Sequence, residues 1–124
     1  MSVEVKNYVT GEVEEKLYAS SNTIAKGTIT PYTVLKDSIP EGYDAVAVSV
    51  ACSQDSEVSF YLKVAGKQVY ANGLNTAGLA GLTEETLLLV KIPEKKEFEV
   101  GFTNINSTTD KTVNWRFRVR LFKK

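Results

Sequence analysis

Apolar and polar residues alternate most regularly near the end of the chain. Between residues 113 and 121 every odd position is apolar, and every even position is Asn or Arg. Because successive side chains of an extended strand point to opposite sides, this period of two places one face in a core and the other in water. The segment is therefore predicted to be a half-buried β-strand.

The same alternation recurs in residues 57–64 and 97–103. The inward sets are Val58, Phe60, Leu62 and Val64 in the first, and Phe98, Val100 and Phe102 in the second. Residues 86–92 are apolar on both faces, which predicts a central strand. Residues 44–50 combine Val with small Ala and Ser, which predicts a central strand or a close packing partner. Residues 28–35 contain Pro31 and are expected at a sheet edge or across a bend.

Turn-forming residues separate these segments. Pro40 and Gly42 mark one turn, and residues 104–111 form a polar loop. Ala65-Gly66-Lys67 is a tight connection that suits a hairpin between residues 58–64 and 68–70. About seven or eight short strands at this spacing predict an all-β fold, either a sandwich or a small barrel. We expect a two-sheet antiparallel sandwich over residues 28–124, with the jelly roll as the favoured topology.

The N-terminal segment leaves two interpretations open. Thr10 could cap a short helix in which Val13 and Leu17 lie four residues apart, and the same residues also suit an extended arm. Two or three apolar residues would anchor a helix weakly, so a loosely held segment is favoured. Residues 1–27 are thus predicted to be an N-terminal arm or a short helical segment.

Composition narrows the possible functions. The 124 residues suit one domain, and 15 Lys plus Arg balance 15 Asp plus Glu. Proteins that grip a phosphate backbone usually carry a basic excess, so this balance argues against a nucleic-acid partner. It also leaves self-association electrostatically unopposed. The N-terminus does not have the pattern of a signal peptide and no segment is long and apolar enough to span a membrane, so we expect synthesis in a cytoplasm and no membrane partner.

Candidate chemistry is sparse. The chain contains no histidine, which excludes Ser–His triads, Cys–His dyads and histidine metal sites. Cys52, in a predicted strand, is expected to be a buried structural thiol. A carboxylate pair for glycoside hydrolysis stays possible, but most acids stand beside lysines in runs typical of solvated surfaces. We therefore expect no enzymatic activity and no cofactor.

The strongest binding candidate is a row of three arginines, Arg116, Arg118 and Arg120, on the polar face of the last predicted strand. They stand about 7 Å apart along the strand. One interpretation pairs them with acids of a neighbouring strand, for which Glu97 and Glu99 are suitable. The other makes them a surface for an anionic partner, which could be a subunit, an acidic glycan or a nucleic acid.

Two further groups are candidates for binding. Residues 71–85 form a long Gly-rich connection with three leucines, Leu74, Leu79 and Leu82. These leucines could plug the end of the sandwich, or they could form an apolar contact surface for a partner or a second subunit. Tyr61 and Tyr70, with Phe122, are expected on strand surfaces, where aromatic rings can stack on sugars or enter protein interfaces.

The order of the predicted strands and loops resembles that of a known class of proteins. Residues 58–70, the Gly/Leu-rich crossover, residues 87–93 and 98–104, and the closing segment 115–122 together resemble small β-sandwich proteins of tailed-phage and other viral particles. Such proteins decorate capsids or form head and tail fittings. The resemblance implies a homo-oligomeric virion component, often trimeric, that is made in the host cytoplasm and has an N-terminal arm contacting the shell.

Two functions follow as expectations. The first is a non-enzymatic structural protein whose partners are copies of itself and a larger protein lattice. The alternative is a carbohydrate-binding module or adhesin that uses Tyr61 and Tyr70 with nearby Asn and Arg residues to hold a glycan.

Overall fold

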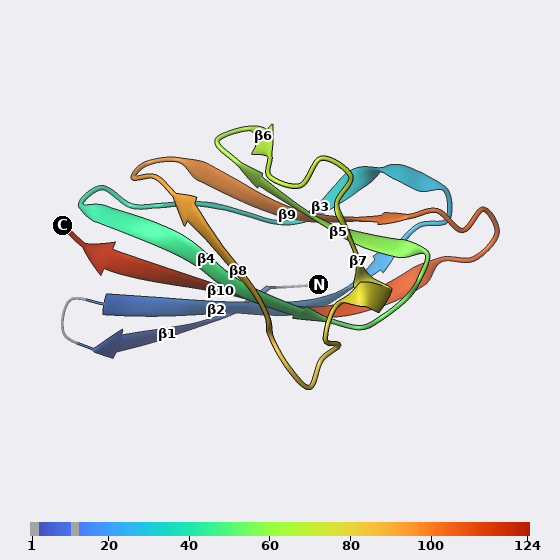
Figure 1. Cartoon of the computed structure of the whole chain (residues 1–124), viewed down its shortest axis with the longest axis horizontal. Coiled ribbons are helices and arrows are strands. Elements are labelled where there is room, and N and C mark those ends of the chain that lie inside the picture. The colour runs from blue at the N-terminus through green and yellow to red at the C-terminus, as the bar shows by residue number, and fades with distance from the viewer. Residues whose placement is uncertain (1–2, 11–12) are drawn as a thin grey trace.

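The computed structural model describes residues 3–10 and 13–124, and two antiparallel sheets pack against each other in it (Figure 1). Sheet A has the order β1-β2-β10-β4-β8, and sheet B has the order β3-β9-β5-β6, with β7 also paired to β5. The strands are β1 Glu4–Thr10, β2 Val13–Ile24, β3 Thr28–Ser38, β4 Tyr43–Cys52, β5 Val58–Val64, β6 Lys67–Gln68, β7 Leu74–Asn75, β8 Thr86–Ile92, β9 Glu97–Asn104 and β10 Lys111–Lys123. A 3-10 turn, η1 Thr76–Gly78, follows β7. The prediction of a two-sheet antiparallel sandwich is confirmed, and the jelly-roll topology stays a prediction.

The alternating segments build the core as predicted. All the odd positions from Val113 to Leu121 on β10 are buried, as are the inward positions of β9 and those of β5 as far as Leu62. At the centre, the ring of Phe117 from sheet A lies 6.3 Å from that of Phe60 and 5.9 Å from that of Phe98, both from sheet B. These rings therefore join the two layers.

The prediction of a helix or loose arm is wrong for residues 13–24. They form β2, which pairs with β10 from Val13 opposite Phe122 to Ile24 opposite Lys111. Tyr18 of β2 is buried, and its hydroxyl donates a 2.6 Å hydrogen bond to Asp37 of β3 in the other sheet. A ladder along the whole of β10 satisfies more backbone groups than a short, weakly anchored helix could.

The expected boundary at residue 28 therefore falls between two strands of one sandwich. Residues 4–10, in the same N-terminal segment, form β1 at the edge of sheet A beside β2. Residues 11 and 12 of the predicted helix, and residues 1 and 2 of the predicted arm, lie outside the described residues.

The prediction of a central strand is right for β4 and wrong for β8. β4 lies between β10 and β8, whereas β8 is the last strand of sheet A. Leu88, Val90 and Ile92 of β8 face the core, while Leu87 and Leu89 are exposed on the other side. The apolar second face of this strand is thus not covered by any part of the described chain.

Two turn and edge predictions are confirmed. β3, which contains Pro31, is an edge strand with register shifts beside the proline. The predicted hairpin after β5 is present, but its connection is two residues long, because Lys67 already belongs to β6. Ala65 and Gly66 form this connection with φ values of 53° and 79°. Positive φ at both central residues matches the right-handed twist of the flanking strands.

Candidate functional site

The arginine row lies on the outer face of sheet A, and two of its three members pair with acids. Arg118 is held between two carboxylates, with Nε 2.9 Å from Oε1 of Glu85 and Nη1 hydrogen-bonded to Oε1 of Glu15. Nη2 of Arg120 lies 3.0 Å from the other oxygen of Glu15. Nη2 of Arg116 donates to the carbonyl of Leu82 at 2.6 Å.

The prediction that Glu97 and Glu99 face the arginine row is wrong. Glu97 and Glu99 stand on β9, which belongs to sheet B, whereas β10 lies between β2 and β4 in sheet A. Glu15 comes from β2, and Glu85 comes from the connection that precedes β8. The strand order, which the sequence does not state, decides which acids reach the row.

The ion pairs hold both carboxylates in their charged form. Burial acts to raise the pKa of the Glu15 carboxyl, but the hydrogen bonds and charges of Arg118 and Arg120 outweigh it, so this pKa lies below its usual 4.5. The hydrogen bond from Arg118 likewise lowers the pKa of Glu85, against the opposing effect of burial. These acids are therefore not poised to exchange protons near neutral pH.

Acid should weaken the fold through these two groups. Because their pKa is depressed in the folded state, their stabilising effect is complete above the unfolded value near 4.5 and is lost as the pH falls through the folded value. We expect the free energy of unfolding, measured with urea, to drop between pH 5 and about pH 3. The variant Glu15→Gln should show a shallower drop. Equal slopes for the variant and the wild type would contradict this assignment.

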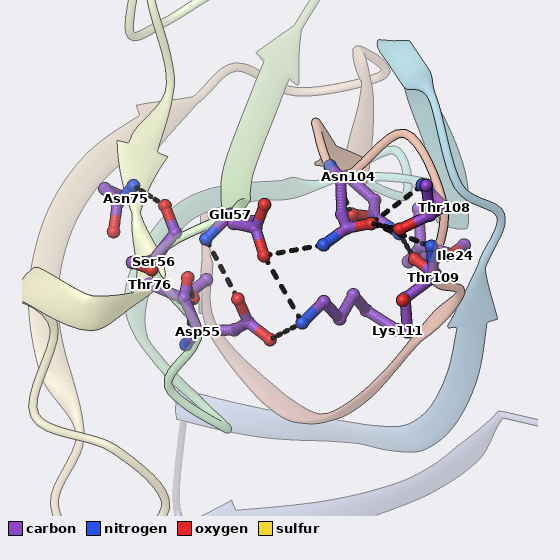
Figure 2. Close-up of polar contacts among 11 residues, drawn as sticks. Ile24, Asp55, Ser56, Glu57, Asn75, Thr76, Asn104, Thr108, Thr109 and Lys111 are labelled. Atoms are coloured by element: carbon purple, nitrogen blue, oxygen red, sulfur yellow. Dashed lines mark hydrogen bonds and ion pairs between the residues drawn. The ribbon is translucent and has the colours of Figure 1, made fainter.

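A second polar cluster closes one end of the sandwich (Figure 2). The ammonium group of Lys111 lies 3.2 Å from Asp55 and 3.5 Å from Glu57, and Glu57 also accepts a hydrogen bond from Asn106. The buried amide of Asn104 donates to the carbonyls of Ile24 and Thr109. Each of these groups is paired with another part of the chain, so the cluster joins the ends of β2, β5, β9 and β10.

The crossover between the sheets places its three leucines differently. Leu74 and Leu79 pack against the core, as the plug interpretation predicts, while Leu82 is half-buried and offers its carbonyl to Arg116. Buried Thr76 anchors the segment, since its hydroxyl donates to the carbonyl of Asp55 at 2.7 Å. The packed leucines leave less apolar area for a partner than an exposed loop would.

The two tyrosines are partly covered. A methyl group at Gly73, which has a φ of 70°, would come within 2.7 Å of the Tyr61 ring, so the crossover lies directly against this ring. Tyr70 packs against the core, and burial raises the pKa of its hydroxyl. Neither ring stands free as a platform for sugar stacking, whereas Phe122 is 40% exposed.

Cys52 is buried at the end of β4, as predicted. Burial raises the pKa of its thiol to about 11, which leaves almost no thiolate at neutral pH. We expect a thiol reagent such as Ellman's to react with Cys52 only at the rate of unfolding, and at once in denaturant. Rapid labelling of the native protein would contradict the burial of this residue.

Sequence reasoning missed an exposed pair of leucines on the outer face of sheet A. Leu87 and Leu89 on β8 are 68% and 65% exposed, and β8 has no strand of the described chain on its outer side. Leu89 has a φ of 53° and lies in a bulge, where Leu88 and Leu89 oppose the single residue Val48. A positive φ is uncommon for a bulky residue and tends to mark functional positions. The signal in the sequence was the apolar second face of residues 86–92.

No protein-family model and no curated protein matches this sequence. Within the described part of the chain, no helix has the length and apolar character to cross a membrane. The surface of the sandwich is therefore the source of functional evidence, and the β8 edge is one of the sheet edges that internal contacts leave open.

Proposed function

We propose that this chain is a non-enzymatic structural protein that assembles with copies of itself and with a larger protein lattice, as a capsid-decoration or head and tail component of a viral particle. The observation that carries the proposal is the open edge of β8 with its exposed Leu87 and Leu89. Sheet edges normally avoid unwanted pairing by means of charges, proline or covering loops. β8 has a bulge and Lys91, yet it also presents two exposed leucines, and an edge with exposed apolar side chains favours the addition of another chain.

The connectivity of the strands supports a jelly roll within this proposal. Strands β2-β10-β4-β8 face strands β3-β9-β5-β6, and successive strands pass repeatedly from one sheet to the other. A jelly roll of eight strands made of two Greek keys would have this kind of alternation. Because that architecture serves both capsid proteins and lectins, fold alone does not choose between the two functions.

Surface chemistry favours assembly over sugar binding. Arg118 and Arg120 are held in ion pairs, and the rings of Tyr61 and Tyr70 are partly covered. The exposed leucines, by contrast, gain about 25 cal/mol for each Å² of apolar surface that a neighbour covers. A glycan site would need a free aromatic platform beside unpaired polar groups.

Sedimentation velocity tests the proposal. The wild type should sediment faster than a 13.7 kDa monomer as its concentration rises, and the double variant Leu87→Asp/Leu89→Asp should stay a monomer. Ile29→Asp is a matched control, because Ile29 is 78% exposed on an edge strand of the other sheet. A wild type that is monomeric at every concentration, but that binds a glycan array and loses binding on Tyr61→Ala, would replace this proposal with the carbohydrate-binding alternative.

A further inference from the structure

We infer that β8 pairs in antiparallel orientation with β8 of a second copy, about a two-fold axis that passes beside Leu88. The inference rests on the proposed function, that the chain assembles through this edge, and it adds the partner and the register. The resulting contact would join the two copies of sheet A into one continuous sheet. A two-fold contact of this kind closes after two copies and needs only one self-complementary surface.

The outward side chains along this edge are self-complementary. The outer face of β8, together with the residue just before the strand, presents Glu85, Leu87, Leu89 and Lys91 in that order. Glu85 belongs to this face because its carboxylate contacts Arg118 there. When a second copy runs in the opposite direction, Leu87 faces Leu89 of the second copy, and Glu85 faces Lys91 of the second copy. The pattern thus matches each leucine with a leucine and each charge with its opposite.

The charges at the two ends are available for this pairing. Lys91 makes no ion pair with any residue that the structure describes. Glu85 accepts from Ser49 and Arg118, chiefly through Oε1, and its Oε2 lies 3.2 Å from Arg118. A carboxylate oxygen can accept more than one hydrogen bond, so Oε2 has capacity for the lysine of a second copy. The chain's net charge of zero does not oppose the approach.

The inner side of the strand also benefits from a neighbour. Leu88 and Val90 are only partly buried against the core, because no further strand of the described chain flanks β8. A second β8 would cover the rest of their surface. In the inferred register Leu88 faces Leu88 of the second copy, which extends the core across the axis.

The bulge shapes this contact. Leu89 adopts a left-handed backbone, which is unfavourable for a residue with a branched side chain. The distorted backbone there interrupts a regular ladder, so leucine packing and the two end ion pairs should carry much of the contact. A seven-residue edge buries far less than the roughly 1,600 Å² of a standard interface. We therefore expect a dissociation constant of about micromolar order, which repeated contacts in a lattice would strengthen.

Cysteine cross-linking tests the register. Facing residues of an antiparallel pair have Cα atoms about 4.5–5.5 Å apart, whereas diagonal neighbours are about 7–8 Å apart, beyond the usual reach of a disulfide. A mixture of Leu87→Cys and Leu89→Cys copies, oxidised with oxidised glutathione, should give a disulfide-linked dimer in high yield. Each variant alone should give several-fold less, and Leu88→Cys alone should cross-link through the axis.

Controls separate this inference from the function on which it rests. The wild type gives the background, since its single Cys52 is buried, and a mixture of Ile29→Cys and Tyr32→Cys tests an exposed edge of the other sheet. If sedimentation shows an oligomer but neither the mixture nor Leu88→Cys cross-links above the background, the β8 pairing is overturned and the assembly function stands. If the chain never oligomerises, both fall together.

The charge pattern gives a second, independent readout. Lys91→Glu turns two attractions into two repulsions, and it should raise the dissociation constant of the dimer about tenfold at low salt. The difference from the wild type should shrink as salt screens the charges. Lys63→Glu, on β5 of the other sheet, is the matched control and should leave association unchanged. An unchanged dissociation constant for Lys91→Glu would contradict the inferred register.

Discussion

Phe117→Ala should lower the free energy of unfolding by about 3–5 kcal/mol, a large share of the roughly 5–15 kcal/mol that is typical of a whole domain. Phe117 is fully buried on β10, and its ring lies between Phe60 and Phe98 of the opposite sheet. Removing it loses the transfer free energy of the ring and leaves a cavity that two β-sheets cannot easily close. Denaturant unfolding followed by tryptophan fluorescence measures the change, because Trp115 lies on the same strand and face.

The same strand offers a control for this prediction. Phe122→Ala removes an identical side chain from a position that is 40% exposed, beyond the end of the buried face. Its cost should stay below about 1 kcal/mol. Similar losses for the two variants would mean that the inner and outer faces of β10 are not as described.

Asn104→Ala should lower the free energy of unfolding by about 3 kcal/mol. The buried amide of Asn104 donates to the carbonyls of Ile24 and Thr109, and it accepts from the backbone N–H of Asn106 (Figure 2). Alanine leaves these three backbone groups without their partner at the end of the sandwich where four strands meet. An unsatisfied buried group costs about 1–3 kcal/mol, partly recovered where water can enter. Urea unfolding at neutral pH measures the loss.

Asn104→Asp sharpens the test. It keeps the shape of the side chain but replaces the donating NH₂ with an acceptor that faces two carbonyl oxygens, so it should cost at least as much as alanine. Asn114→Ala, on the exposed face of β10, is the control and should change stability by less than about 0.5 kcal/mol. A small loss of stability on Asn104→Asp would show that the amide of Asn104 does not link Ile24 to the loop of residues 105–110.

Strands that bury one face in the core could be predicted from the sequence, because burial on one side makes apolar and polar residues alternate. In β10 and β9 the alternation is strict because every second residue enters the core. In β2 it is weak, because inward positions such as Asn22 are polar. Asn22 accepts a 2.9 Å hydrogen bond from the indole of Trp115, which no local pattern reveals. A polar residue that is satisfied by a distant partner looks like a surface residue in the sequence.

The candidate site was harder to predict than the fold. The pairing of the arginine row was foreseen as one alternative, but its partners Glu15 and Glu85 depend on the strand order. Leu87 and Leu89 were assigned to a central strand, because an apolar face is usually covered within the same chain. If a second copy covers that face instead, the sequence pattern correctly predicts that the face is buried but does not show which molecule covers it.

Hydrogen–deuterium exchange as a function of protein concentration tests the central claim most directly, that β8 is the surface through which copies associate. Amides of Thr86–Ile92 should exchange more slowly as concentration rises, while those of β3, an edge of sheet B, keep the same rate. Exchange in β8 that does not depend on concentration, in a sample that sediments as an oligomer, would contradict the claim and place the interface elsewhere.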